Sequence, residues 1–124
     1  MLGVLLVGIG GAIGSITRYL LGGWFAIRFG TAFPYGTFTI NVTGSFIIGF
    51  FLAFTQERVA ISPYWRLLFA VGFLGGYTTF STFEYESISL LRNGEMLLSA
   101  LYMIGSLVVG AIAAIGGVAL GSWI

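Results

Sequence analysis

The hydrophobic residues of this chain fall into long segments separated by short polar connections. The segments span about residues 2–27, 36–55, 64–91 and 96–123. Each can cross a bilayer as a helix, because roughly 20 mainly apolar residues at about 1.5 Å per residue span the hydrocarbon core. The connections carry Pro, Asn, Gly and charged residues, which favour turns. The pattern therefore predicts an all-α integral membrane protein with four transmembrane helices, folded as a single domain over residues 1–124.

Composition supports a lipid environment and excludes several kinds of chemistry. Of the 124 residues, 58% are hydrophobic and 7% are charged, whereas a soluble domain carries about 25% charged residues. The sequence contains no Cys and no His. It therefore lacks thiol nucleophiles, disulfides and the imidazole used in most acid–base catalysis and zinc sites. It also has no Walker motif for a nucleotide, and we expect a protein that is not an enzyme.

The arginines give almost no signal for membrane orientation. With four helices both termini lie on one side, together with Arg58 and Arg66, while Arg28 and Arg92 lie on the other side. Orientation follows the excess of Lys and Arg, and here the split is two against two, or two against three when Arg18, which lies deeper in the first helix, is counted. A chain without a preferred orientation can insert both ways. This leads to the hypothesis of dual topology and an antiparallel dimer.

Small residues recur along one face of several predicted helices. Gly10 and Gly14 form a GxxxG pair in the first helix. Because membrane helices associate through close packing of small residues, we expect such faces to contact other helices. The second and fourth helices carry similar series at three- and four-residue steps, namely Thr37, Asn41, Ser45 and Gly49, and Ser99, Tyr102, Ser106, Gly110, Ala113, Gly117 and Gly121.

The third segment contains the sequence GFLGGYTTFSTF at residues 72–83. Gly costs about 1 kcal/mol relative to Ala within a helix, and Thr can bond its own backbone, so the sequence predicts a helix break over Gly75–Thr79. Non-helical backbone at membrane depth occurs only where it is buried in protein or lines water. Its carbonyls can hold a cation and its amides can approach an anion. The alternative is a kinked, tightly packed helix without such a role.

Aromatic rings and neutral hydrogen-bond donors accompany this segment. Phe80 and Phe83 are three residues apart, and the positive edge of a ring can meet a small anion, although most Phe in membrane helices contact lipid or core. Asn41 offers two amide donors inside a span, although interhelical hydrogen bonding is its commoner use. Neutral donors suit an anion that must shed water and still move on. The donor series is Asn41, Thr37, Ser81, Thr82, Tyr102 and Ser106.

Several motifs resemble those of the CrcB/Fluc family of fluoride channels over essentially the whole chain. They are GTFTIN at 36–41, GFLGGYTTFSTF at 72–83 with Glu86 after it, GSITR at 14–18, and Tyr102 four residues before Ser106. The resemblance implies a fluoride-selective channel in the cell membrane that exports cytoplasmic fluoride passively and lowers fluoride toxicity. It also implies an antiparallel, dual-topology homodimer with two fluoride pathways, each built from both subunits.

The resemblance further implies roles for individual residues. Arg18 and Glu86 match residues of the aqueous vestibule. The backbone carbonyls of Gly75 and Thr78 fall where family members bind a structural Na⁺ on the dimer axis, so Na⁺ is the expected cofactor. By position, the fluoride pathway comprises Asn41, Phe80, Phe83, Ser81, Thr82, Tyr102 and Ser106, and Thr37 joins it from the donor series.

Two other functions share some of these features. A small dual-topology drug exporter has similar length and span count, but it needs a carboxylate in the first helix to exchange protons for cations. The only charged residue of that helix is Arg18, which argues against an exporter. An accessory membrane subunit needs only the glycine series, but this reading leaves the predicted break and Asn41 unexplained.

Overall fold

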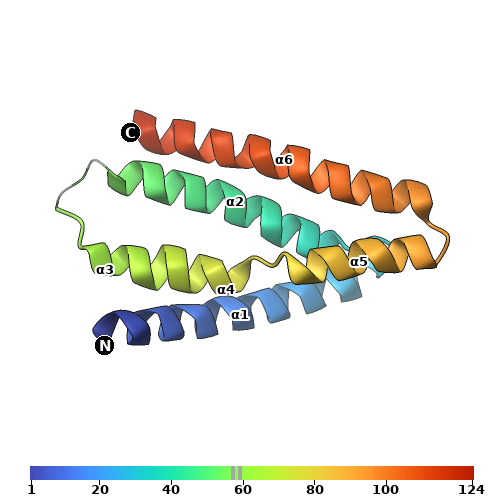
Figure 1. Ribbon diagram of the computed structural model, residues 1–124, viewed down its shortest axis with the longest axis horizontal. Coiled ribbons are helices and arrows are strands. Elements are labelled where there is room, and N and C mark those ends of the chain that lie inside the picture. Colours follow the sequence, from blue (N-terminus) through green and yellow to red (C-terminus); the bar gives the residue numbers. More distant parts are fainter. Residues whose placement is uncertain (57, 59) are drawn as a thin grey trace.

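The computed structural model describes every residue except 57 and 59, and the described residues form helices joined by short connections (Figure 1). No strand occurs among them, so the predicted all-α class is confirmed. The helices are α1 (Leu2–Phe29), α2 (Tyr35–Gln56), α3 (Pro63–Trp65), the π-helix η1 (Arg66–Leu74), α4 (Gly75–Tyr77), α5 (Ser81–Arg92) and α6 (Met96–Trp123).

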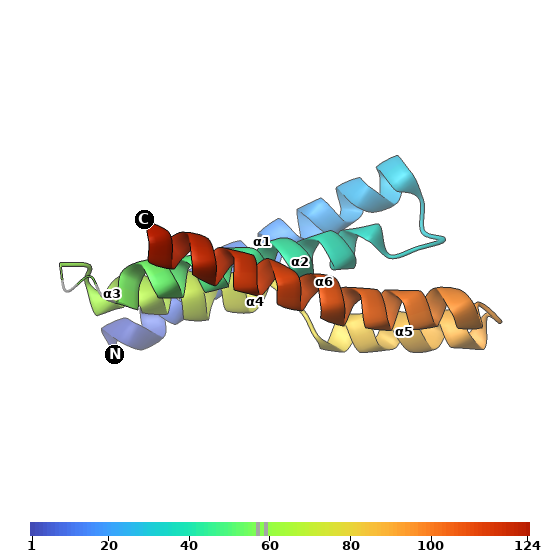
Figure 2. The ribbon, with the colours of Figure 1, turned by 90° about the horizontal axis from the view of Figure 1, so that it is seen from above.

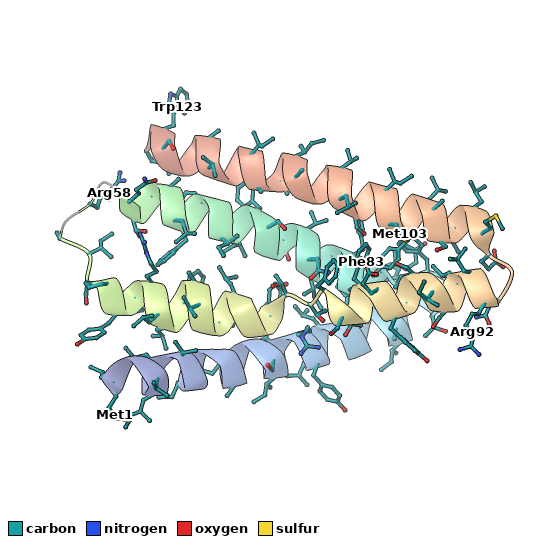
Figure 3. The ribbon with its side chains drawn as sticks, viewed as in Figure 1. Met1, Arg58, Phe83, Arg92, Met103 and Trp123 are labelled. Atoms are coloured by element: carbon teal, nitrogen blue, oxygen red, sulfur yellow. The ribbon has the colours of Figure 1, made fainter. Side chains whose placement is uncertain are left out.

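Within the described part of the chain, α1, α2 and α6 are each long and apolar enough to cross a membrane. The third predicted span is composite: α3, η1 and α4 follow one another directly, and α5 continues in the same direction after a short non-helical stretch (Figure 1). Both termini lie at one end of the bundle. Arg58 lies at that end and Arg92 at the opposite one (Figure 3). The arrangement is that of a multi-pass membrane protein.

Glycines bring α1 against η1 and α4. A Cβ atom on Gly10 would lie 2.1 Å from the Leu68 carbonyl oxygen, and one on Gly14 would lie 2.1 Å from the Phe73 carbonyl oxygen. Atoms do not come this close, so only Gly fits at these positions. The prediction that the GxxxG pair forms a packing face is confirmed.

Glycines also bring α6 against α2, which runs beside it in the same direction (Figure 1). A Cβ on Gly117 would lie 2.1 Å from the Phe46 carbonyl oxygen, and one on Gly49 would lie 2.6 Å from the Ala114 carbonyl oxygen. The predicted packing faces of the second and fourth helices therefore meet each other.

The two ends of the bundle are packed differently. Away from the termini, the last part of α1 and the start of α2 diverge from α5 and α6 (Figure 2). The divergence leaves a cavity beside α5 in which polar side chains gather. The buried apolar residues form two clusters, one of Ile40, Leu74 and Tyr77 and one of Phe83, Leu90 and Tyr102.

Candidate ion pathway

The break in the third span covers residues 78–80. The sequence predicted it over Gly75–Thr79, so its start was placed three residues too early. The chain stays helical there because the Thr78 amide still donates to the Leu74 carbonyl at 3.0 Å. Gly76 instead serves packing, since a Cβ on it would lie 2.5 Å from a backbone oxygen of α1. Thr78 then adopts an extended conformation, with φ −83° and ψ 158°.

The side chain of Asn41 holds the break against α2. Its Nδ2 donates to the Thr79 carbonyl at 2.9 Å, and its Oδ1 accepts from the Thr79 amide at 2.9 Å. The side-chain amide thereby pairs with one backbone unit through both its donor and its acceptor. Interhelical hydrogen bonding, one of the two uses expected for Asn41, is present. The second Nδ2 proton is left for another acceptor.

Two backbone carbonyls at the break lose their helical donors. In a continuous helix the Thr79 amide would donate to the Gly75 carbonyl, but it donates to Asn41 instead. Likewise the Thr82 amide, which would serve the Thr78 carbonyl, donates to Thr79 Oγ1 at 3.4 Å. A Cβ built on Gly75 meets nothing within 4 Å, so this side of the break is open. Carbonyl oxygens of this kind are ligands that a hard cation prefers.

Phe80 and Phe83 lie at the start of α5, with ring centroids 6.0 Å apart. Their environments differ, because Phe80 precedes the helix and is 71% exposed whereas Phe83 is 7% exposed. The Phe83 ring meets Tyr102 of α6 edge to face at 5.1 Å, near Met103 between the two helices (Figure 3). Phe83 is therefore held in place by packing, while the Phe80 ring is available to a ligand or a second subunit.

A cavity of about 360 Å³ lies beside these rings. Of the residues that the structure describes, Ser106 alone has a buried side-chain oxygen without a hydrogen-bond partner. An unpaired hydroxyl at membrane depth is unfavourable, so the cavity favours an occupant that accepts a hydrogen bond. Its lining includes Asn41, Ser45, Thr78, Thr79, Phe80, Phe83 and Ser106.

Tyr102 and Glu86 tie α6 to α5. Tyr102 is completely buried, and its hydroxyl donates to Glu86 Oε1 at 2.9 Å. One turn earlier, Ser99 Oγ donates to the Ser87 carbonyl at 2.8 Å. The ring of Phe33, from the connection between α1 and α2, meets Tyr102 edge on at 5.3 Å. The single proton of the Tyr102 hydroxyl is therefore already donated to a carboxylate in this structure.

A second cavity, of about 790 Å³, opens where α1 and α2 diverge from α5 (Figure 2). It is lined by both charged residues expected in a vestibule, Arg18 and Glu86. Arg18 Nε donates to the Gly76 carbonyl at 3.1 Å, so the guanidinium charge is held next to the break. A cation fixed at the wall of a cavity attracts anions.

Comparison with known proteins decides the family. The sequence profile of the family described as CrcB-like protein, Camphor Resistance (CrcB), matches residues 5–118. The chain belongs to the CrcB family. Three relatives are each named fluoride-specific ion channel FluC. The one from Chloroflexus aurantiacus is 52% identical over 97% of this chain and 95% of its own length. The one from Acidobacterium capsulatum is 48% identical over 95% and 94%, and the one from Rhizobium meliloti is 46% identical over 94% of both chains.

In this CrcB protein the pathway residues expected from the sequence are divided between the two cavities. The smaller cavity holds Asn41, Phe80, Phe83 and Ser106. The larger cavity holds Arg18, Thr37, Thr82 and Glu86. Tyr102 is connected to the larger cavity through its bond to Glu86, and Ser81 lies exposed in the first turn of α5. Thr79 lines both cavities, so the break lies between them.

Ser45 and Thr79 line the cavities, although the sequence pattern predicted no role for them in an ion pathway. Ser45 lies one turn after Asn41 and donates back to the Asn41 carbonyl at 2.7 Å. Helical spacing was a sufficient signal for Ser45, because it belongs to the polar series of the second helix. No comparable signal existed for Thr79, whose partner Asn41 lies 38 residues earlier.

Proposed function

We propose that this CrcB protein is a fluoride channel of the cell membrane that exports cytoplasmic fluoride passively. The FluC relatives cover nearly the whole chain. The observation that carries the proposal is the buried, unpaired hydroxyl of Ser106 beside the rings of Phe80 and Phe83. A hydroxyl donor and positive ring edges suit a small anion, which accepts hydrogen bonds and carries no proton of its own to donate. The protein is a channel and not an enzyme.

Export by this route needs no chemical energy source. Hydrogen fluoride is a weak acid that crosses lipid uncharged and ionises in the more alkaline cytoplasm. An inside-negative membrane potential then drives the anion outward, with about 2.3 kcal/mol per charge per 100 mV. A selective path for fluoride therefore lowers fluoride toxicity.

The proposed pathway passes from the larger cavity to the smaller one. Arg18 attracts the anion into a vestibule that it shares with Glu86, and the hydroxyls of Thr37 and Thr82 meet the anion there. The smaller cavity then offers the remaining amide proton of Asn41. Beyond it lie the ring edges of Phe80 and Phe83 and the hydroxyl of Ser106. In this proposal Ser81 joins from the exposed first turn of α5, and Tyr102 acts through Glu86, to which its hydroxyl donates.

The proposed functional unit is an antiparallel homodimer in which both subunits contribute to each pathway. A single chain leaves the Phe80 ring 71% exposed and the backbone open at Gly75, and open backbone at membrane depth requires cover by protein or water. A second copy in the opposite orientation supplies that cover. The balanced arginines allow both orientations to form.

The freed carbonyls of Gly75 and Thr78 fit a structural Na⁺ at the interface of this dimer. One subunit offers two such oxygens, and a symmetric pair offers four. A bound Na⁺ would compensate carbonyl dipoles that the break leaves without donors and would hold the two breaks together. The cation has a structural role in this proposal and takes no part in conduction.

Growth in fluoride tests the proposed function directly. Expression in a bacterial strain that lacks fluoride export should restore growth in fluoride-containing medium of slightly acidic pH. The Ser106→Ala variant should restore it less well, whereas Ser122→Ala, a matched change at the exposed end of α6, should act like wild type. Failure of the wild-type chain to restore growth, when it is present in the membrane, would contradict fluoride export. Full rescue by Ser106→Ala would exclude the role of that hydroxyl.

A further inference from the structure

Tyr77, the last residue of α4, lies immediately before the break and is 7% exposed. Its ring stacks on Phe73, with centroids 5.7 Å apart and planes inclined by 12°. Its hydroxyl lies 2.9 Å from Thr43 Oγ1 of α2. Because lipid offers no hydrogen bonds, a tyrosine hydroxyl at membrane depth needs a partner within the protein. Thr43 is that partner.

The neighbouring bonds determine which hydroxyl donates. Thr43 Oγ1 lies 2.7 Å from the Thr39 carbonyl oxygen and 3.1 Å from the Ile40 carbonyl oxygen. Carbonyls only accept, so the single proton of Thr43 goes to the α2 backbone. Tyr77 therefore donates to Thr43. The hydrogen bonds run from the end of α4 through one side chain into α2, and each hydroxyl proton has an acceptor.

Residues 77–79 each contact one residue of α2. Thr43 accepts from the first of them, and Asn41 pairs with the backbone of the last. Gly44 leaves room for the middle one, because a Cβ on Gly44 would lie 2.3 Å from Thr78 Cγ2. The polar contacts on either side of Thr78 thus fix both ends of the turn from helix into extended chain.

We propose that Tyr77 and Thr43 form a positioning pair, whose hydrogen bond sets where α4 ends against α2 and so places the carbonyls and the Phe80 ring of the break. The inference rests on the proposed fluoride pathway. Both hydroxyls lie outside the two cavities that the pathway uses. The pair therefore acts through the residues that it holds and does not touch the ion.

The current through a single channel separates this role from general packing. A packing defect lowers the number of active dimers, whereas a displaced break lowers the fluoride current of each one. Tyr77→Phe keeps the ring stack and Thr43→Val keeps the volume, so each removes only the hydroxyl. Purified dimers of each variant and of the double variant are to be recorded in planar bilayers in fluoride solution.

We expect each single variant to reduce the unitary fluoride current about fivefold, the factor that corresponds to one net intramolecular hydrogen bond. The double variant should show no further loss, because both changes remove the same bond. Thr43→Ser, which keeps the hydroxyl, should restore the current relative to Thr43→Val.

Two matched variants serve as controls. Thr55→Val removes a hydroxyl that donates within α2 to the Phe51 carbonyl at 2.8 Å, and Tyr64→Phe removes an exposed tyrosine hydroxyl from α3. Both should keep the wild-type unitary current. If either lowered it as much as Tyr77→Phe does, the effect would not be specific to the pair.

Wild-type unitary currents in Tyr77→Phe and Thr43→Val would overturn the proposal, as would additive losses in the double variant. If Tyr77→Phe does not assemble, the comparison of Thr43→Val with Thr43→Ser decides, since equal currents in those two would exclude the role of the hydroxyl. Phe80→Ile and Phe83→Ile are measured alongside. Unchanged currents in these two variants would contradict the proposed pathway itself. Reduced currents in them, together with wild-type currents in Tyr77→Phe and Thr43→Val, would contradict only the positioning role of Tyr77 and Thr43.

Discussion

Asn41 holds the backbone of the break and, in the proposed pathway, also donates a hydrogen bond to the ion. Both amide atoms are bonded to Thr79 at 2.9 Å, so the amide cannot turn over without losing two hydrogen bonds. Its remaining proton therefore points in a fixed direction. A donor oriented before the ion arrives loses little free energy to reorganisation when it binds.

Replacing Asn41 by Asp should lower fluoride efflux from liposomes about tenfold or more, because it removes a donor and leaves buried polar groups unpaired. One carboxylate oxygen would face the Thr79 carbonyl oxygen, and the added negative charge would repel the anion. Gln56→Glu makes the same chemical change at the exposed end of α2 and should leave efflux unchanged. An Asn41→Asp dimer that conducts like wild type would count against the assignment.

Replacing Phe80 or Phe83 by Ile should have similar effects on fluoride efflux but different effects on the stability of the protein. Phe80→Ile and Phe83→Ile both lose the ring edge, so both should reduce fluoride efflux from assembled dimers. Thermal unfolding in detergent should show a loss of roughly 1 kcal/mol for Phe83→Ile, since the buried ring packs on Tyr102, and a smaller effect for exposed Phe80. Unchanged efflux in either variant would exclude that ring from the pathway.

At the scale of the helices, the break in the third span depends on α2, because Asn41 of α2 pairs with the Thr79 backbone. The segment lengths could be predicted closely because bilayer thickness determines them, as with α1, which spans Leu2–Phe29 and was predicted over about 2–27. The faces packed through Gly10, Gly14 and Gly117 could be predicted from spacing alone. The start of the break and the π-helix η1 could not, because they depend on contacts between residues far apart in the chain.

Gly14 tests the packing of α1 against the third span. Gly14→Ala places a Cβ 2.1 Å from the Phe73 carbonyl oxygen, and we expect a loss of about 3 kcal/mol in the free energy of unfolding. Gly8→Ala on the same helix meets nothing within 4 Å and should be neutral or stabilising by up to about 1 kcal/mol. Denaturation of both variants in detergent checks this, and equal stability would contradict the close contact.

At the scale of the whole molecule, the proposed fluoride route needs a second subunit. The residues expected in one pathway lie in two cavities on either side of Thr79, and the Phe80 ring projects from the chain. The sequence could indicate which residues are candidates for the pathway, since their types and spacing are visible in it. It could not assign them to separate cavities, because that division follows from the divergence of α1 and α2 from α5 (Figure 2).

Dual topology can be measured by labelling, because the native chain has no cysteine. Single cysteines are introduced at exposed positions in connections at opposite ends of the bundle, as Ala32→Cys and Ala60→Cys. A membrane-impermeant thiol reagent should label about half of each variant in intact cells, since insertion in both orientations exposes either end equally. Complete labelling of one variant and none of the other would show a single orientation.

Fluoride-selective conduction can be measured as anion efflux from liposomes that contain the purified protein. Fluoride and chloride are compared under an imposed potassium gradient with valinomycin, which sets the membrane potential. We expect fast fluoride efflux with little chloride efflux, and slower fluoride efflux in Phe80→Ile, Phe83→Ile and Asn41→Asp. Efflux of neither anion from verified dimers, or equal efflux of both, would contradict a fluoride-selective channel.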